Sequence, residues 1–296
     1  GANLFAGTAD GIYISTNNGS TWTYIIDNWS TFSMLNQNGT IYAGTNSGLF
    51  TSADNGGFWA KAPLYNMGIY AFTKSGSYLF AGTDEYGIYK SSNDGQFWEP
   101  TGISTGIFLC FTTNGNYVYS GAVDGVYLSS NNGTNWIQTS LNNDAVYSIA
   151  VNGSTVFAGC GYAFYISTNN GTNWSQGTLN EVSTSLLVSG GNVYSGTYNG
   201  VFVSTNNGST WTQTSLNNRS VFSLALGTGR MFAGTEGFGV YYTTNNGTTW
   251  IQSSLNNYKI TSLAVSGNTV IAGTEADGIY LSNDNGNTWF PKNQGI

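Results

Sequence analysis

The stretch Ser204-Thr-Asn-Asn-Gly-Ser-Thr-Trp211 is one copy of an eight-residue motif that returns along the whole chain. The motif reads Ser or Thr, any residue, Asn or Asp, any residue, Gly, any two residues, and Trp. Its eight copies end at Trp22, Trp59, Trp98, Trp136, Trp174, Trp211, Trp250 and Trp289, so consecutive tryptophans lie 37 to 39 residues apart. A period of this length that covers the chain predicts a repeat fold.

One full repeat contains four short runs that are rich in β-branched and aromatic residues. The clearest example has runs at 221–226, 231–235, 239–243 and 249–252. Gly227-Thr-Gly229 separates the first two runs, and the Asn-Asn-Gly of the motif separates the last two, as expected for hairpin turns. Four antiparallel strands in every repeat, without a helical period, are typical of the blade of a β-propeller.

The strand count predicts how the propeller is assembled. The second, third and fourth runs of the repeat each occur eight times, but the first run occurs only seven times. Its copies begin near Thr31, Ile69, Ile107, Val146, Ser183, Val221 and Ile260. We therefore predict an all-β fold: an eight-bladed β-propeller of four-stranded antiparallel blades, with residues 1–296 as a single domain whose first blade lacks its innermost strand. We expect the C-terminal tail, residues 291–296, to lie beside that first blade.

Composition and charge exclude several classes of protein. The net charge is -7, and the seven Lys and Arg residues form no cluster, which argues against nucleic acid as a partner. No run of 18 apolar residues is present, so we expect no membrane span. The surface must be built from Asn, Ser, Thr and Gly, which is typical of secreted or cell-surface bacterial repeat proteins. The chain starts at Gly1 rather than Met, so we expect a processed protein or part of a longer chain. We also expect a monomer.

The motif resembles the Asp-box or BNR repeat, which occurs in sialidases, sortilin-like receptors, xyloglucanases and a family of photosystem II assembly factors. The resemblance covers all eight repeats. It implies that the motif forms the hairpin between the third and fourth strands of each blade. The third motif position is Asn six times and Asp only at Asp54 and Asp284, so this chain departs from the family's usual residue.

The motif has a structural and a calcium-binding interpretation. In the structural one, Gly supplies a positive φ, the Ser and Asn side chains bond turn amides, and Trp packs into the sheet. Calcium is the alternative, but most copies offer no carboxylate to a hard cation. We favour the structural interpretation and expect no metal and no cofactor. For Cys110 and Cys160, two free thiols and a disulfide both remain open, with free thiols favoured.

Catalytic residues of the resembled enzymes are largely missing. Sialidases hold their substrate with three arginines, whereas this chain has only Arg219 and Arg230, and it has no His for a catalytic triad or a histidine metal site. A glycoside hydrolase that uses two carboxylates stays open as an alternative. We expect a non-catalytic protein.

The loops that vary most between repeats join the second run to the third and the fourth run to the next repeat. Both kinds lie on one face of a propeller, opposite the motif turns, and ten of the 14 carboxylates fall on that face. We predict that it binds a glycan or a protein through aromatic stacking and carboxylate acceptors. A purely structural scaffold is the remaining alternative. The candidate ligand-binding residues are Asp10, Asp84, Glu85, Tyr86, Asp124, Tyr162, Tyr198, Glu236, Phe238, Glu275 and Asp277.

Overall fold

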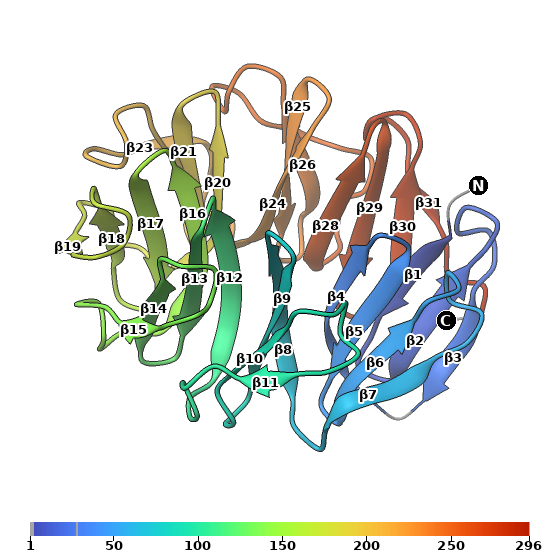
Figure 1. Cartoon of the computed structure of the whole chain (residues 1–296). Helices are drawn as coiled ribbons and strands as arrows, with labels where there is room; N and C mark the ends of the chain where they lie inside the picture. Colours follow the sequence, from blue (N-terminus) through green and yellow to red (C-terminus); the bar gives the residue numbers. More distant parts are fainter. Residues whose placement is uncertain (1–2, 28, 296) are drawn as a thin grey trace.

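The computed structural model describes residues 3–27 and 29–295, and its strands form eight antiparallel sheets. The sheets follow one another around a ring in chain order, and the last blade lies beside the first (Figure 1). The first blade has three strands and every other blade has four. The predicted eight-bladed propeller is confirmed, including the first blade that lacks its innermost strand.

The strands of the eight blades have these bounds. Blade 1 contains β1 (Leu4–Gly7), β2 (Gly11–Ser15) and β3 (Thr23–Asp27). Blade 2 contains β4 (Thr31–Gln37), β5 (Thr40–Thr45), β6 (Gly48–Ser52) and β7 (Ala60–Tyr65). Blade 3 contains β8 (Ile69–Ser75), β9 (Tyr78–Thr83), β10 (Ile88–Ser91) and β11 (Glu99–Pro100). Blade 4 contains β12 (Phe108–Asn114), β13 (Tyr117–Ala122), β14 (Gly125–Ser129) and β15 (Ile137–Gln138).

The second half of the ring repeats the same order. Blade 5 contains β16 (Val146–Asn152), β17 (Thr155–Cys160), β18 (Phe164–Ser167) and β19 (Ser175–Gln176). Blade 6 contains β20 (Ser183–Ser189), β21 (Asn192–Thr197), β22 (Gly200–Ser204) and β23 (Thr212–Asn217). Blade 7 contains β24 (Val221–Gly227), β25 (Arg230–Thr235), β26 (Gly239–Thr243) and β27 (Ile251–Gln252). Blade 8 contains β28 (Ile260–Ser266), β29 (Thr269–Thr274), β30 (Ile279–Ser282) and β31 (Phe290–Pro291).

Each four-stranded blade begins at its inner strand, and inner strands of neighbouring blades contact one another around the ring. The loops between second and third strands lie at the same end of the blade as the connections to the next inner strand. Backbone hydrogen bonds join the two kinds of loop, as from Glu236 N–H to the Ser220 carbonyl at 2.9 Å and from Asp84 N–H to the Gly68 carbonyl at 2.9 Å. We call this end the loop face; the inner hairpins and the motif turns form the opposite face.

The motif turn satisfies its own polar groups. In blade 6, the Ser204 hydroxyl accepts the Gly208 N–H at 2.7 Å and donates to Asn206 Oδ1 at 2.9 Å. The same Asn206 oxygen accepts the Thr210 N–H at 2.9 Å. Gly208 has a φ of 78°, a conformation that glycine adopts without strain. The motif oxygens are therefore used inside the turn.

The motif also holds neighbouring blades together. A Cβ on Gly133 would lie 2.1 Å from the ring of Phe80 in the preceding blade, so only glycine leaves room for that ring. Trp136, from the same motif copy, meets Phe80 edge-on at 5.9 Å between ring centroids. Trp22 and Trp98 are buried, and the other six motif tryptophans are half-buried. Each copy thus packs against an aromatic or aliphatic side chain of the blade before it.

Blades 8 and 1 close the ring through a small apolar cluster. Ala6 and Trp22 of blade 1 pack with Ile279 of blade 8. The backbone N–H of Trp22 donates to the Gln294 carbonyl at 2.9 Å, so the tail lies beside the first blade as expected. Ile296, where the alignment of repeats would start another inner strand, lies outside the described residues.

Candidate functional site

All eleven candidate residues lie in the loops between second and third strands, and so on the loop face. Nine of them are exposed, whereas Asp84 and Asp124 are half-buried. Tyr162 is the most exposed of the candidate rings, with 88% of its surface accessible, and Tyr198 follows with 52%. Rings of this size that stay in water are available for stacking against a ligand.

The structure brings four of the candidates together across blades 6 to 8. The Arg219 guanidinium lies over the Phe238 ring, 3.8 Å from the ring centroid. Lys259 Nζ lies 2.6 Å from Glu275 Oε1 and 3.8 Å from Glu236 Oε1. The hydrogen bond to Glu275, followed by the charges of both glutamates, raises the pKa of Lys259. These contacts hold the loops of blades 7 and 8 in register.

A ring from an inner strand joins these loops. Phe222 meets Tyr198 edge-on at 6.4 Å between centroids and lies 5.5 Å from Lys259 Nζ. We call this group the blade 6–8 cluster; its members are Tyr198, Arg219, Phe222, Glu236, Phe238, Lys259 and Glu275. It combines three aromatic rings, two cations and two carboxylates on adjoining loops, a mixture that suits recognition of a polar ligand with an apolar face.

The other candidates are distributed around the ring. Asp10 lies on blade 1, Asp84, Glu85 and Tyr86 on blade 3, Asp124 on blade 4, Tyr162 on blade 5 and Asp277 on blade 8. Asp124 has a local structural role, because its Oδ2 accepts the Tyr127 hydroxyl at 3.0 Å and Gln138 Nε2 at 3.3 Å. Burial, followed by this bond to Asp124, raises the pKa of Tyr127 to about 12.

The second residue of each inner strand has a special place that the sequence did not predict. Strand pairing skips this residue in all seven inner strands, as between Val221 and Ser223 in β24. Such a β-bulge redirects the side chain of the extra residue. The seven residues are Phe32, Tyr70, Leu109, Tyr147, Thr184, Phe222 and Thr261. Phe32 and Tyr70 stack at 4.5 Å, so bulged rings from neighbouring blades meet at the loop-face end of the inner strands.

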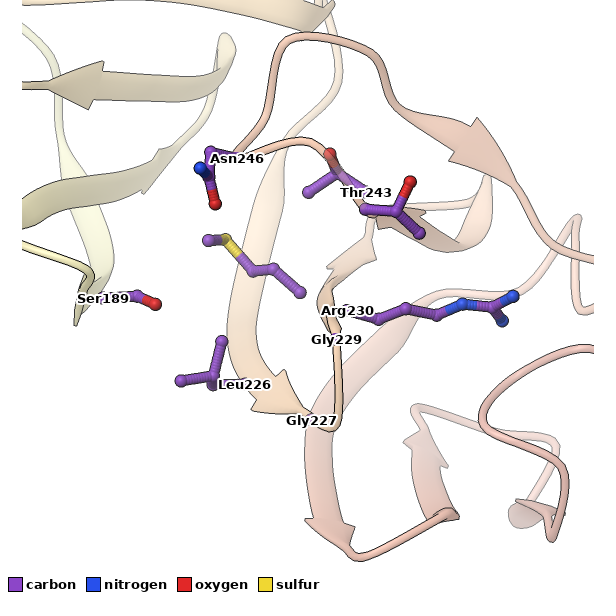
Figure 2. A pocket seen from close by; sticks show the side chains of 9 residues that line it. Ser189, Leu226, Gly227, Gly229, Arg230, Thr243 and Asn246 are labelled. Carbon is purple, nitrogen blue, oxygen red and sulfur yellow. The ribbon is translucent and has the colours of Figure 1, made fainter.

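One pocket on the opposite face has a charged residue, Arg230, in its lining. This pocket of about 280 Å³ sits beside the β24–β25 hairpin, between Ser189, Leu226 and Asn246. Figure 2 shows Arg230 extending away from these three side chains. Its guanidinium stacks on Tyr242 at 4.2 Å and donates to the Asn285 carbonyl of blade 8 at 2.5 Å. Arg230 therefore serves the contact between blades 7 and 8 rather than the pocket.

Among the described residues there is no metal-binding cluster, no reactive cysteine and no membrane-spanning helix. Within residues 3–27 and 29–295, no group of three or more Asp, Glu, Cys or His side chains could hold a metal ion. Cys160 is buried and Cys110 half-buried, and both are free thiols. Desolvation raises the pKa of both, to about 12 for Cys110, which keeps them as thiols rather than nucleophilic thiolates. The part of the chain that the structure describes has no helix long and apolar enough to cross a membrane.

Comparisons with known proteins identify the fold. No family model and no curated protein matches the chain. Among solved structures, the computationally designed protein Ika8 has a TM-score of 0.78 at 14% identity, over 95% of this chain and 93% of Ika8. The likeness is one of fold.

Two further structures are natural or ancestral in origin. The extracellular domain of the putative one component system BT4673 from B. thetaiotaomicron has a TM-score of 0.67 at 22% identity. An ancestral GH74 enzyme has a TM-score of 0.64 at 20% identity. They match 94% and 98% of this chain, which in turn spans only 39% of the BT4673 chain and 52% of the GH74 enzyme.

Proposed function

We propose that residues 1–296 form one non-catalytic domain of a secreted or cell-surface protein, and that its loop face binds a neutral or basic glycan. The eight self-bonded motif turns support a place among the Asp-box propellers. The extracellular domain of BT4673, which shares the fold, supports a role outside the cell. The observation that carries the proposal is the blade 6–8 cluster, where the exposed rings of Tyr198 and Phe238 lie beside carboxylate and cationic side chains.

The chemistry of this cluster matches a sugar. The Tyr198 ring can stack on the apolar face of a pyranose, while the adjoining Asn199 and Glu181 side chains offer polar partners for its hydroxyls. These two side chains already lie within hydrogen-bond distance of each other, with Asn199 Nδ2 2.8 Å from Glu181 Oε2. The net charge of -7 disfavours acidic polysaccharides, so the ligand is neutral or basic.

The glycoside hydrolase alternative is weaker in this cluster. Glycosidases need two carboxyl groups that flank the scissile bond, one of them able to donate a proton. Glu236 and Glu275 instead share the Lys259 ammonium in a salt bridge. The GH74 enzyme is about twice as long as this chain, so its activity is not carried over with the fold.

A binding experiment tests the proposal. The purified protein is first screened by thermal shift against neutral and amino-sugar oligosaccharides, with and without calcium, and hits are titrated by calorimetry. We expect Tyr198→Ala and Phe238→Ala to weaken binding at least about tenfold, which is about 1.4 kcal/mol, without lowering the melting temperature. Phe97→Ala is the matched control, because Phe97 is 62% exposed on a motif turn of the opposite face. Equal affinity of all variants, or no oligosaccharide that binds, would contradict the proposal.

A further inference from the structure

The inner edge of blade 1 is a strand position without a strand. In blade 7, inner strand β24 pairs with β25 from Val221 opposite Thr235 to Gly227 opposite Arg230, and the other four-stranded blades pair alike. In blade 1, β1 pairs with β2 alone among the described strands. Its backbone N–H and C=O groups on the other side therefore form an edge that can accept a further strand.

Blade 8 provides a wall shaped for the missing side chains. In blades 2 to 7, the glycine of the second strand lies against the first residue of the next inner strand; Gly234, for example, faces Ile260, and Gly196 faces Val221. Gly273 is the corresponding glycine of blade 8. A Cβ built on it would meet only Thr261 and Ser262 of its own blade. The place for one apolar side chain is therefore built but open.

Side chains of blade 8 around this open position are more exposed than their counterparts in other blades. Ile271 is half-buried, whereas Phe232, Tyr194 and the four other equivalent side chains of blades 2 to 7 are at most 1% exposed. Ala264 is exposed, although its counterpart Ala225 is only 9% exposed. An open pocket of about 240 Å³ lies here, lined by residues that include Leu4, Ala264, Ile271 and Leu281. We call this gap, bounded by β1, β28 and β29, the inner-strand slot.

Hydrogen bonds between blades fix the register of an added strand. Between blades 6 and 7 and between blades 7 and 8, the N–H of the fourth residue of the inner strand donates to a serine hydroxyl of the preceding inner strand. Leu224 N–H donates to Ser185 Oγ and Leu263 N–H donates to Ser223 Oγ, each at 3.2 Å. Ser262 continues this series at the edge of the slot, and it is exposed. An added strand would place its fourth N–H against the Ser262 hydroxyl.

We propose that the inner-strand slot binds an extended polypeptide segment that has the sequence pattern of the inner strands and is added in trans to residues 1–296. The interface between inner strands runs continuously from β4 to β28, and the slot is its continuation. The pattern is that of β24: a β-branched residue first, a small residue third, and aliphatic residues fourth and sixth. Backbone pairing with β1 provides affinity, and the open position at Gly273 provides selectivity.

A synthetic peptide tests the proposal. It has the sequence of residues 219–228, carries a fluorescent label, and is titrated into the full chain by fluorescence polarisation; a scrambled peptide of the same composition is the control. We expect saturable binding that is at least tenfold tighter than that of the scrambled peptide. We also expect slower hydrogen exchange of the β1 amides at saturation.

Variants locate the binding site. Gly273→Val fills the open position, and Ala264→Trp fills the slot from an exposed residue, so each is expected to weaken peptide binding at least tenfold. Tyr198→Ala, on the loop face, is expected to bind the peptide unchanged, which separates this proposal from the proposed glycan binding. Equal binding of both peptides, or unchanged binding by both slot variants, would overturn the proposal. So would a self-associated chain, detected by analytical ultracentrifugation, that the slot variants dissociate, because the occupant would then be a second copy.

Discussion

Asp284 and Asn206 occupy the same place in their motif turns. Asp284 Oδ1 accepts the Ser282 hydroxyl at 2.7 Å and the Thr288 N–H at 2.9 Å. Asn206 Oδ1 accepts the corresponding two bonds, each at 2.9 Å. The turn needs one oxygen acceptor at this position, which either side chain provides. Exchange of Asn and Asp therefore keeps these two bonds. It changes the charge, and it reverses a third bond: Asn206 Nδ2 donates to the Thr210 hydroxyl, whereas Asp284 Oδ2 accepts from the Thr288 hydroxyl.

The charge should make the stability of the Asp284 turn depend on pH. Burial by itself would raise the pKa of Asp284, but hydrogen bonds from Thr288, Ser282 and the Asn287 backbone lower it from 3.8 to about 2. A carboxyl whose pKa is lowered on folding stabilises the protein above its unfolded pKa, and this contribution is lost as the pH falls through its folded pKa. As the pH is lowered from about 4 to about 2, the melting temperature of Asp284→Asn should therefore fall less than that of the unmodified protein.

Thermal denaturation across this range, with Asp10→Asn as an exposed-carboxyl control, measures the difference. Parallel curves for Asp284→Asn and the unmodified protein would show that the carboxylate contributes nothing.

The turn into the third strand is built in the same way in six blades. In blade 7, the Thr235 hydroxyl donates to the Gly239 carbonyl at 2.7 Å. Gly239 has a φ of 71°, and a Cβ there would lie 1.9 Å from the Leu255 carbonyl. A threonine that ends the second strand and a glycine that begins the third therefore fix the loop between them, which carries Glu236 and Phe238. The scaffold is repeated, while the residues it presents differ.

Replacing the threonine of this turn should destabilise blade 7. Thr235 is fully buried, so Thr235→Val keeps the shape of the side chain but leaves the Gly239 carbonyl without its hydroxyl donor. We expect a loss of about 1–3 kcal/mol in the free energy of unfolding, measured by urea denaturation. The matched control, Thr244→Val, changes an exposed threonine and should stay within about 0.5 kcal/mol. Similar losses for both variants would mean that the hydrogen bond is not the cause.

The ring as a whole is weakest between blades 8 and 1. The cluster that joins them contains three buried side chains, whereas a cluster shared by blades 2 and 3 contains eight. β1 has no inner strand beside it, and β28 has exposed residues at four of its seven positions. Local opening should therefore begin at this boundary, because few buried apolar contacts resist it.

Native-state hydrogen exchange followed by mass spectrometry tests this expectation. Segments that contain β1 and β28 should exchange faster than the matched segments of β17 and β20, where all neighbouring strands are in place. The comparison is internal, since these segments have similar sequences and the same place in their blades. Equal protection around the ring would show that the missing strand does not weaken it.

The fold could be predicted from the motif, but the grouping of the loop-face residues could not. Tyr198, Glu236 and Glu275 belong to three repeats, and nothing in the spacing of the repeats states how far apart their loops end. Phe222 was missed for another reason. It lies inside an apolar run, and the alternation of a strand gives no sign that pairing skips this residue. The same applies to Gly133, whose role against Phe80 depends on a side chain from another blade.

The sequence by itself determined the number of blades, their strand order and the absence of one inner strand, because each blade is a local unit encoded within one repeat. The tertiary structure decided which loops meet, where the bulged rings lie and that an empty strand position remains between blades 8 and 1. Those features depend on contacts between residues of different repeats, and such contacts exist only once the ring has closed.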